Sequence, residues 1–260
     1  MATLVTMILH PLADGFVGIL QSAHAFAAFQ IAEHWGNRLT PRPSPRPEVL
    51  AAVLLHDAGW DGREVQRLDV QGRPLAFDTL PEDEHEKIWA SSVERAAVLG
   101  RYPAYLVSHH VSNLAEMGGT ERHRAFLVGQ EELRERLRSE LADDPRYRAA
   151  LLTETDLVNR AVMRLADALA VHLTRGGENA LFPSLPRRGG SVPLSVKPMA
   201  ERAFRLRPWP LVGQRLDLTT EGRRLPAQRF PNEASLREAW ERAPTVRLTW
   251  TLLATGTPVD

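Results

Sequence analysis

Histidines and aspartates, which bind divalent metal ions, recur in this sequence where helices are expected. The adjacent pair His56-Asp57 ends an apolar segment just before Gly59. Neighbouring side chains on a helix point about 100° apart, so the imidazole can hold an ion while the carboxylate reaches that ion or a second one. Taken alone, the pair is about equally compatible with a buried histidine beside a turn-capping aspartate.

Two further histidines lie at the start of apolar helical stripes. The stripe of His24 ends at Trp35, and the stripe of His85 includes Trp89. Both histidines can be inward metal ligands. The alternatives are a hydrogen-bonded core histidine at His24 and charge balance among acidic neighbours at His85. His34 lies roughly 80° off the first stripe, so it is expected at the rim.

The doublet His109-His110 and Asp167 fall on two other expected helices. His110 shares a face with Leu106, so periodicity favours His110 as a ligand, and His109 stays open. Asp167 falls on the side of Arg164. That spacing favours a surface ion pair three residues apart, and the pattern alone does not select Asp167 as a ligand.

The composition limits the class of protein. The chain contains no cysteine, which excludes disulfides, thiolate nucleophiles and iron–sulfur clusters. Any metal must therefore be held by histidine or by oxygen, ligands that suit iron, manganese or zinc. The net charge is zero, so no nucleic-acid or membrane-surface partner is expected. No long apolar run is present, and we expect a soluble, cytoplasmic protein. Its expected partners are a small-molecule substrate and, as one option, a second copy of the chain in a homodimer.

The elements that must position these residues are mostly helical. Hydrophobic periodicity and flanking Gly and Pro predict helices at 21–36, 48–57, 82–99, 103–116, 124–141, 154–174 and 232–242. Two hairpins are expected, one from 3–9 and 16–20 and one at 211–230 around Glu221-Gly222, with a strand at 245–252. Residues 61–81 are expected to form a loop.

These elements predict one domain over residues 1–260. Its fold class is mainly α, with a small antiparallel sheet built from the chain ends (α+β overall). Residues 1–20 would form the N-terminal β-hairpin and 21–175 the helical metal-binding core. Residues 176–205, rich in Gly, Pro and Arg, would be a connector, and 206–260 a β-rich segment with one short helix.

The order of these residues resembles the HD-domain superfamily of metal-dependent phosphohydrolases over about 21–175. The resemblance rests on a first histidine, a His-Asp pair at a helix end, single histidines on the next two helices, and Asp167 within Leu165–Leu169. It implies an HD-domain-like helical core and makes Asp167 the last ligand. The motifs Gln21-x-x-His24, His56-Asp57-x-Gly59-Trp60, Ser108-x-His110 and Pro208-Trp209-Pro210 resemble more closely the domain-of-unknown-function 3891 family, whose name supplies no reaction.

The HD resemblance implies a dinuclear metal-dependent hydrolase of a small phosphate ester or nucleotide. Its one or two ions (Fe, Mn or Zn) would be held by His24, His56, Asp57, His85, His110 and Asp167. Two closely spaced ions activate water and hold the oxygens of a phosphoryl group. The alternatives are an HD-type di-iron oxygenase with much the same ligands and a metal-stabilised binding or regulatory module without turnover.

Several residues near the motifs are weaker candidates for substrate contacts or proton transfer. Arg63, Arg67 and Arg73 follow the His-Asp pair and can bind phosphate, although a solvated loop is the favoured explanation for any one of them. Asp61 can act as a general acid or base, or it can only orient a ligating histidine through a hydrogen bond. The remaining candidates, which would wall a substrate pocket or lie at its rim, are Trp35, Trp60, Trp89 and His34.

Overall fold

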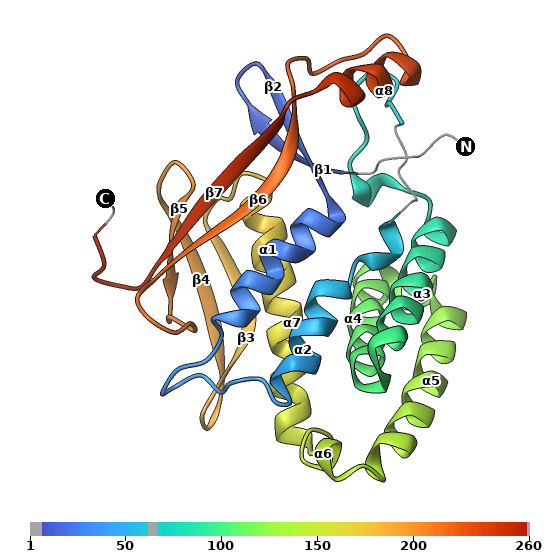
Figure 1. Cartoon of the computed structure of the whole chain (residues 1–260), viewed down its shortest axis with the longest axis vertical. Coiled ribbons are helices and arrows are strands. Elements are labelled where there is room, and N and C mark those ends of the chain that lie inside the picture. The colour runs from blue at the N-terminus through green and yellow to red at the C-terminus, as the bar shows by residue number, and fades with distance from the viewer. Residues whose placement is uncertain (1–6, 62–66, 259–260) are drawn as a thin grey trace.

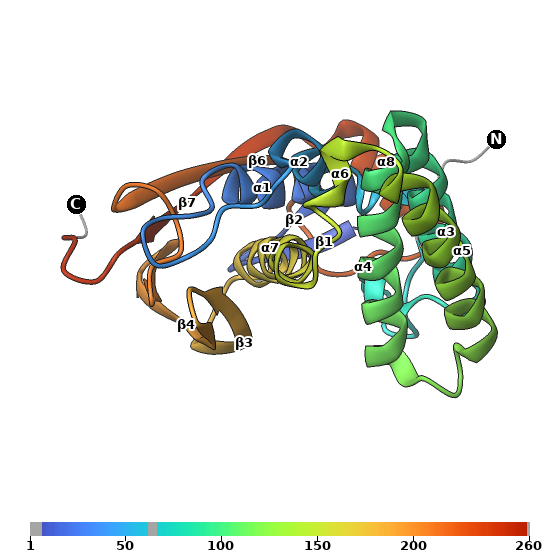
Figure 2. The ribbon, with the colours of Figure 1, turned by 90° about the horizontal axis from the view of Figure 1, so that it is seen from below.

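The computed structural model describes residues 7–61 and 67–258. A curled sheet holds two helices, α1 and α7, on its concave side, and the other large helices lie beside them (Figure 1, Figure 2). The helices are α1 (Gln21–Glu33), α2 (Arg46–Leu55), α3 (Glu82–Leu99), α4 (Arg101–Gly119), α5 (Arg124–Ala142), α6 (Pro145–Arg148), α7 (Thr153–Thr174) and α8 (Glu233–Arg242). Short 3-10 turns span Ala58–Trp60 and Phe77–Thr79.

The described strands form one seven-stranded mixed sheet in the order β1-β2-β6-β7-β5-β4-β3. They are β1 (Met7–Leu12), β2 (Gly15–Leu20), β3 (Ala180–Arg187), β4 (Gly190–Ala200), β5 (Ala203–Arg207), β6 (Arg215–Leu225) and β7 (Thr245–Leu253). Neighbours are antiparallel except β5 and β7, which are parallel. Because β2 pairs with β6, the two ends of the chain meet in the sheet.

The predicted fold class, a mainly α HD-like core with a small antiparallel sheet, is wrong. Helices make up 49% of the described residues and strands 25%, and the sheet is large and curled. Residues 176–205, predicted as a connector, contain β3, β4 and part of β5. The predicted hairpin at 211–230 is instead one continuous strand, β6.

Other predicted elements are confirmed. The long helices lie where periodicity placed them, and β1 and β2 form the N-terminal hairpin with Leu12 opposite Gly15. Residues 3–6 of its first predicted strand lie outside the described residues. No helix in the described part of the chain is long and apolar enough to cross a membrane.

The hydrophobic core fixes α1, α2, α4 and α7 against one another. α1 packs on β6 and on α7, and α2 contacts both α1 and α4. Asn159 of α7 ties three segments together. Its side chain accepts a hydrogen bond from the Ser44 amide and donates to the Ser44 carbonyl and the Tyr102 hydroxyl, at 2.6–2.9 Å. These three hydrogen bonds fix the position of α7 along its axis relative to α4 and the segment before α2.

Candidate metal centre

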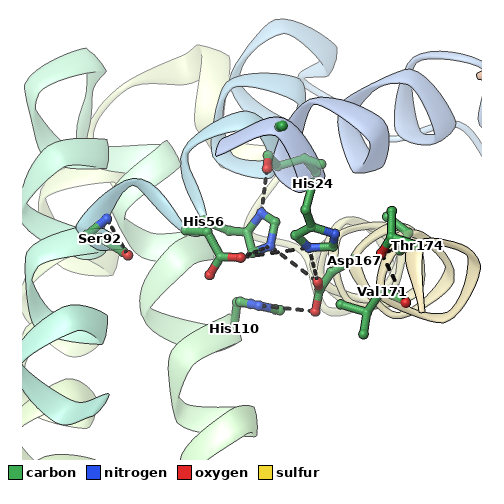
Figure 3. A network of polar contacts seen from close by, with 12 residues as sticks. His24, His56, Ser92, His110, Asp167, Val171 and Thr174 are labelled. Atoms are coloured by element: carbon green, nitrogen blue, oxygen red, sulfur yellow. Dashed lines mark hydrogen bonds and ion pairs between the residues drawn. The ribbon is translucent and has the colours of Figure 1, made fainter. Parts of the chain in front are cut away.

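Four helical segments bring five metal-binding side chains to one point in the core. His24 comes from the first turn of α1, His56 from the end of α2 with Asp57 directly after it, His110 from α4 and Asp167 from α7. Figure 3 shows the imidazoles of the three histidines turned toward the Asp167 carboxylate.

The distances within this cluster suit a shared cation. Asp167 Oδ1 lies 2.9 Å from His24 Nε2 and 3.3 Å from His56 Nε2, and Oδ2 lies 3.6 Å from His110 Nε2. Asp57 Oδ2 is 3.2 Å from His56 Nε2 and 3.7 Å from His24 Nε2. Ligands about 2 Å from an ion lie roughly 3–4 Å from one another, so only small shifts would close this set around one.

The cluster is buried, and several of its ring nitrogens lack a hydrogen-bond partner among the described residues. The three imidazoles are at most 2% exposed, and the two carboxylates 13% and 14%. His24 Nδ1, His56 Nε2 and both ring nitrogens of His110 are buried and have no hydrogen-bond partner among residues 7–61 and 67–258. Such atoms cost about 1–3 kcal/mol each, and a cation beside the carboxylates would offset this cost at His56 Nε2 and His110 Nε2, which face Asp167. The donors therefore fit a divalent ion held by nitrogen and oxygen.

A hydrogen bond orients His56 for this role. Its Nδ1–H donates to the Val53 carbonyl at 2.7 Å, within the last turn of α2. The tautomer this favours presents Nε2 to the carboxylates of Asp57 and Asp167. A ligating histidine commonly fixes its second nitrogen in this way.

The electric field of the cluster shifts its pKa values. Burial lowers the pKa of His56, but the carboxylates of Asp57 and Asp167 beside it outweigh this effect, so the net pKa is raised well above 6.5. Burial raises the pKa of Asp167, but its hydrogen bond with His24 and its close contact with His56 hold it well below 3.8. Burial lowers the pKa of His110 to about 4, so this ring is neutral at pH 7.

These shifts predict how pH affects the metal-free protein. His56 contributes stability that is complete below its ordinary pKa of 6.5 and is lost as pH rises through the raised value. Asp57 and Asp167 contribute stability that is present above 3.8 and is lost as pH falls through their lowered values. A metal must displace the His56 proton, so its affinity should increase with pH above 6.5. Mn²⁺ titrations on both sides of that pH test this, and a flat profile contradicts it.

Gly59 sets the path of the chain directly after the His-Asp pair. A β-carbon at this position would lie 2.0 Å from the Ile88 carbonyl oxygen of α3. The Gly59 amide also donates to Ser92 Oγ at 2.9 Å. The close approach to α3 therefore ends α2 at His56 and turns the chain into the 3-10 segment.

Gly59→Ala is therefore expected to lower the free energy of unfolding by about 2–3 kcal/mol, because the backbone of α3 would have to move. The matched control is Gly129→Ala on exposed α5, where nothing lies within 4 Å and a gain of up to about 1 kcal/mol is expected. Denaturant unfolding of both variants gives the comparison. Equal effects of the two changes would contradict this account of Gly59.

His85 and His109 are not brought to the cluster in the same way. His85 Nε2 lies 3.0 Å from the Phe77 carbonyl oxygen, and the ring stacks on Trp89 at 5.4 Å. His109 packs edge-on against Tyr105. Burial and then the charge of Arg160 lower its pKa to about 2, so His109 is neutral.

The weaker candidates also lie elsewhere. Asp61 is half exposed and pairs with Arg95 at 3.5 Å, so it faces solvent and not the cluster. Arg73 pairs with Asp69 inside an exposed turn. The other described candidates follow the same trend: Arg67 pairs with Glu84, Trp35 and Trp60 are buried in the hydrophobic core, Trp89 packs against His123, and His34 donates to the Gln30 carbonyl. Arg63 lies outside the described residues.

A cavity of about 570 Å³ lies between α4, α7 and the β3–β4 hairpin and reaches His110. Its lining also includes His109 and three arginines, Arg160, Arg164 and Arg187. Sequence reasoning did not single out these arginines as substrate contacts. The spacing of Arg160, Arg164 and Asp167, which places them on one helical face, was the available signal.

Comparison with known proteins identifies a matching family. A family model described as a protein of unknown function, DUF3891, matches residues 7–227. The matched span contains the whole cluster and ends just after β6, so α8 and β7 lie beyond it. Neither the curated proteins nor the solved structures gave a significant match.

Proposed function

This chain belongs to the DUF3891 family of proteins of unknown function, and we propose that it is a metal-dependent hydrolase of a small phosphate ester or nucleotide. The observation that carries the proposal is the buried cluster of three histidines and two aspartates, whose member His110 borders a cavity. A metal centre beside a cavity of small-molecule size is the usual form of a hydrolytic site.

Each residue of the cluster has a definite part in this proposal. His24, His56, Asp57 and Asp167 would hold the ion, with His110 between it and the cavity. When bound, the ion would polarise a phosphoryl oxygen and lower the pKa of water. The carboxylate of Asp167 orients His24 and His56, and the buried surroundings exclude bulk water. His109 is neutral, so its ring can donate one hydrogen bond to a substrate in the cavity and accept another, but it supplies no positive charge.

The proposal is for one ion in this cluster. The dinuclear reading needs His85 as a ligand, and that ring is bonded to the Phe77 carbonyl and stacked on Trp89. The order of the remaining ligands along the helices still resembles that of HD-domain phosphohydrolases. The large sheet that surrounds α1 and α7 has no part in that resemblance.

The test is phosphate release by the full chain supplied with Mn²⁺, Fe²⁺ or Zn²⁺ and a panel of small phosphate esters and nucleotides. We expect metal-dependent release that is absent from His56→Ala. A protein that binds the ion and releases phosphate from no substrate would contradict the hydrolase. Oxygen consumption with Fe²⁺ would then favour the oxygenase, since the same nitrogen and oxygen ligands suit iron.

A further inference from the structure

The cavity beside His110 has an excess of positive charge. Arg160, Arg164 and Arg187 line it, against a single carboxylate, that of Glu154. The whole chain is neutral, with equal numbers of basic and acidic residues. A local excess of guanidinium groups beside a metal cluster therefore points to an anionic ligand.

Two of these guanidinium groups have no acidic partner in the described part of the chain. Arg164 makes one hydrogen bond, to the Pro183 carbonyl at 3.4 Å, and burial lowers its pKa. Neither Arg164 nor Arg187 has a carboxylate within ion-pair distance among the residues that the structure describes, whereas Arg160 pairs with Asp156 at 3.4 Å. Partly buried arginines with unused donors are suited to bind an anion in bidentate fashion.

The hairpin wall of the cavity has a strained backbone at one residue. Ser184 lines the cavity and has a φ of 63°, in the left-handed region that side chains other than glycine rarely adopt. It lies where the pairing of β3 with β4 shifts register between Phe182 and Leu185. Bulges and strained residues of this kind are common beside functional sites, where they redirect side chains.

The arginines and the metal cluster share one helix face. Arg160, Arg164 and Asp167 follow one another at helical spacing along α7, so they lie in one line. Asp167 belongs to the cluster, and His110 belongs to both the cluster and the cavity lining. A ligand held by the arginines would therefore lie next to the proposed metal ion.

We propose that Arg164 and Arg187 form the phosphate-binding clamp of this cavity and select small molecules that carry a phosphate dianion. This inference rests on the proposed hydrolase, because it names the substrate group that the same site recognises. The volume of about 570 Å³ suits one small molecule and is too small for a polymer.

The experiment is calorimetric titration of the full chain with inorganic phosphate, as purified and in an Asp57→Asn background that weakens the metal site. In both backgrounds Arg164→Met and Arg187→Met should each weaken phosphate binding by about tenfold or more, because each removes charged hydrogen bonds. Arg242→Met, on distant α8, should leave it unchanged. Where a methionine variant does not fold, Arg164→Lys and Arg187→Lys keep the charge but lose the bidentate fork, and should still weaken binding.

The two proposals fail in different ways. Phosphate binding that depends on both arginines, without metal-dependent hydrolysis of any ester, would support the clamp and overturn the hydrolase. Hydrolysis with an unchanged KM in folded Arg164→Met and Arg187→Met would support the hydrolase and overturn the clamp. Absence of phosphate binding by the parent protein would also overturn the clamp.

Discussion

Asp167→Asn is expected to lower the affinity for a divalent ion by more than about 100-fold, since loss of even an outer partner of a ligand costs 10–100-fold. Asp167 is the residue that all three imidazoles of the cluster approach, at 2.9, 3.3 and 3.6 Å. The change removes one negative charge and one strong oxygen ligand while it keeps the side-chain shape.

Competition with a metal-chelating dye measures this effect, with phosphate release from an active substrate as the second readout. Asp143→Asn is the control, because Asp143 is exposed beyond the end of α5. We expect wild-type affinity from the control. Affinity within about fivefold of wild type in Asp167→Asn would contradict its place as a ligand.

Asn159→Ala is expected to lower the free energy of unfolding by about 3 kcal/mol or more, because it leaves several buried polar groups unsatisfied. Asn159 is fully buried and bonds both backbone groups of Ser44 and the Tyr102 hydroxyl. These bonds tie the segment before α2 to α4 and α7. His56 follows α2, His110 lies on α4 and Asp167 lies on α7.

Denaturant unfolding of the metal-free protein measures the loss. Tyr102→Phe is the matched control, since it removes one of these bonds and keeps the two to Ser44, and it should cost about 1 kcal/mol. A loss in Asn159→Ala no larger than that in Tyr102→Phe would show that the bonds to Ser44 do not stabilise the fold.

The helices were predictable because their apolar faces repeat at helical spacing, as along α7. The sheet was predicted poorly because its strands carry residues typical of loops. β3 and β4 contain Pro183, Pro186, Pro193 and Pro198. The two in β3 lie in an edge strand with a bulge, where proline is tolerated, and Pro198 lies beside a register shift between β4 and β5. Gly222 suggests a turn, but it lies inside β6. Glycine is needed there because a β-carbon would lie 2.7 Å from the Gly18 carbonyl oxygen of the neighbouring strand.

The cluster shows the same limit of sequence reasoning. Periodicity placed Asp167 on the side of Arg164, which is correct, but the surface ion pair that it favoured is absent from the described contacts. That face of α7 lines a cavity whose opposite wall is the β3–β4 hairpin. This hairpin was not predicted from the sequence. Only tertiary packing distinguishes a buried polar face from a solvated one.

Elemental analysis of the full chain, purified without a metal-affinity tag beside Asp57→Ala, tests the central claim most directly. We expect close to one iron, manganese or zinc ion per chain, lost in the variant, because Asp57 lies within 3.2–3.7 Å of two ligand nitrogens. No stoichiometric metal in the fresh protein, and none regained on soaking with iron, manganese or zinc, would contradict the metal centre and leave the buried histidines a structural role.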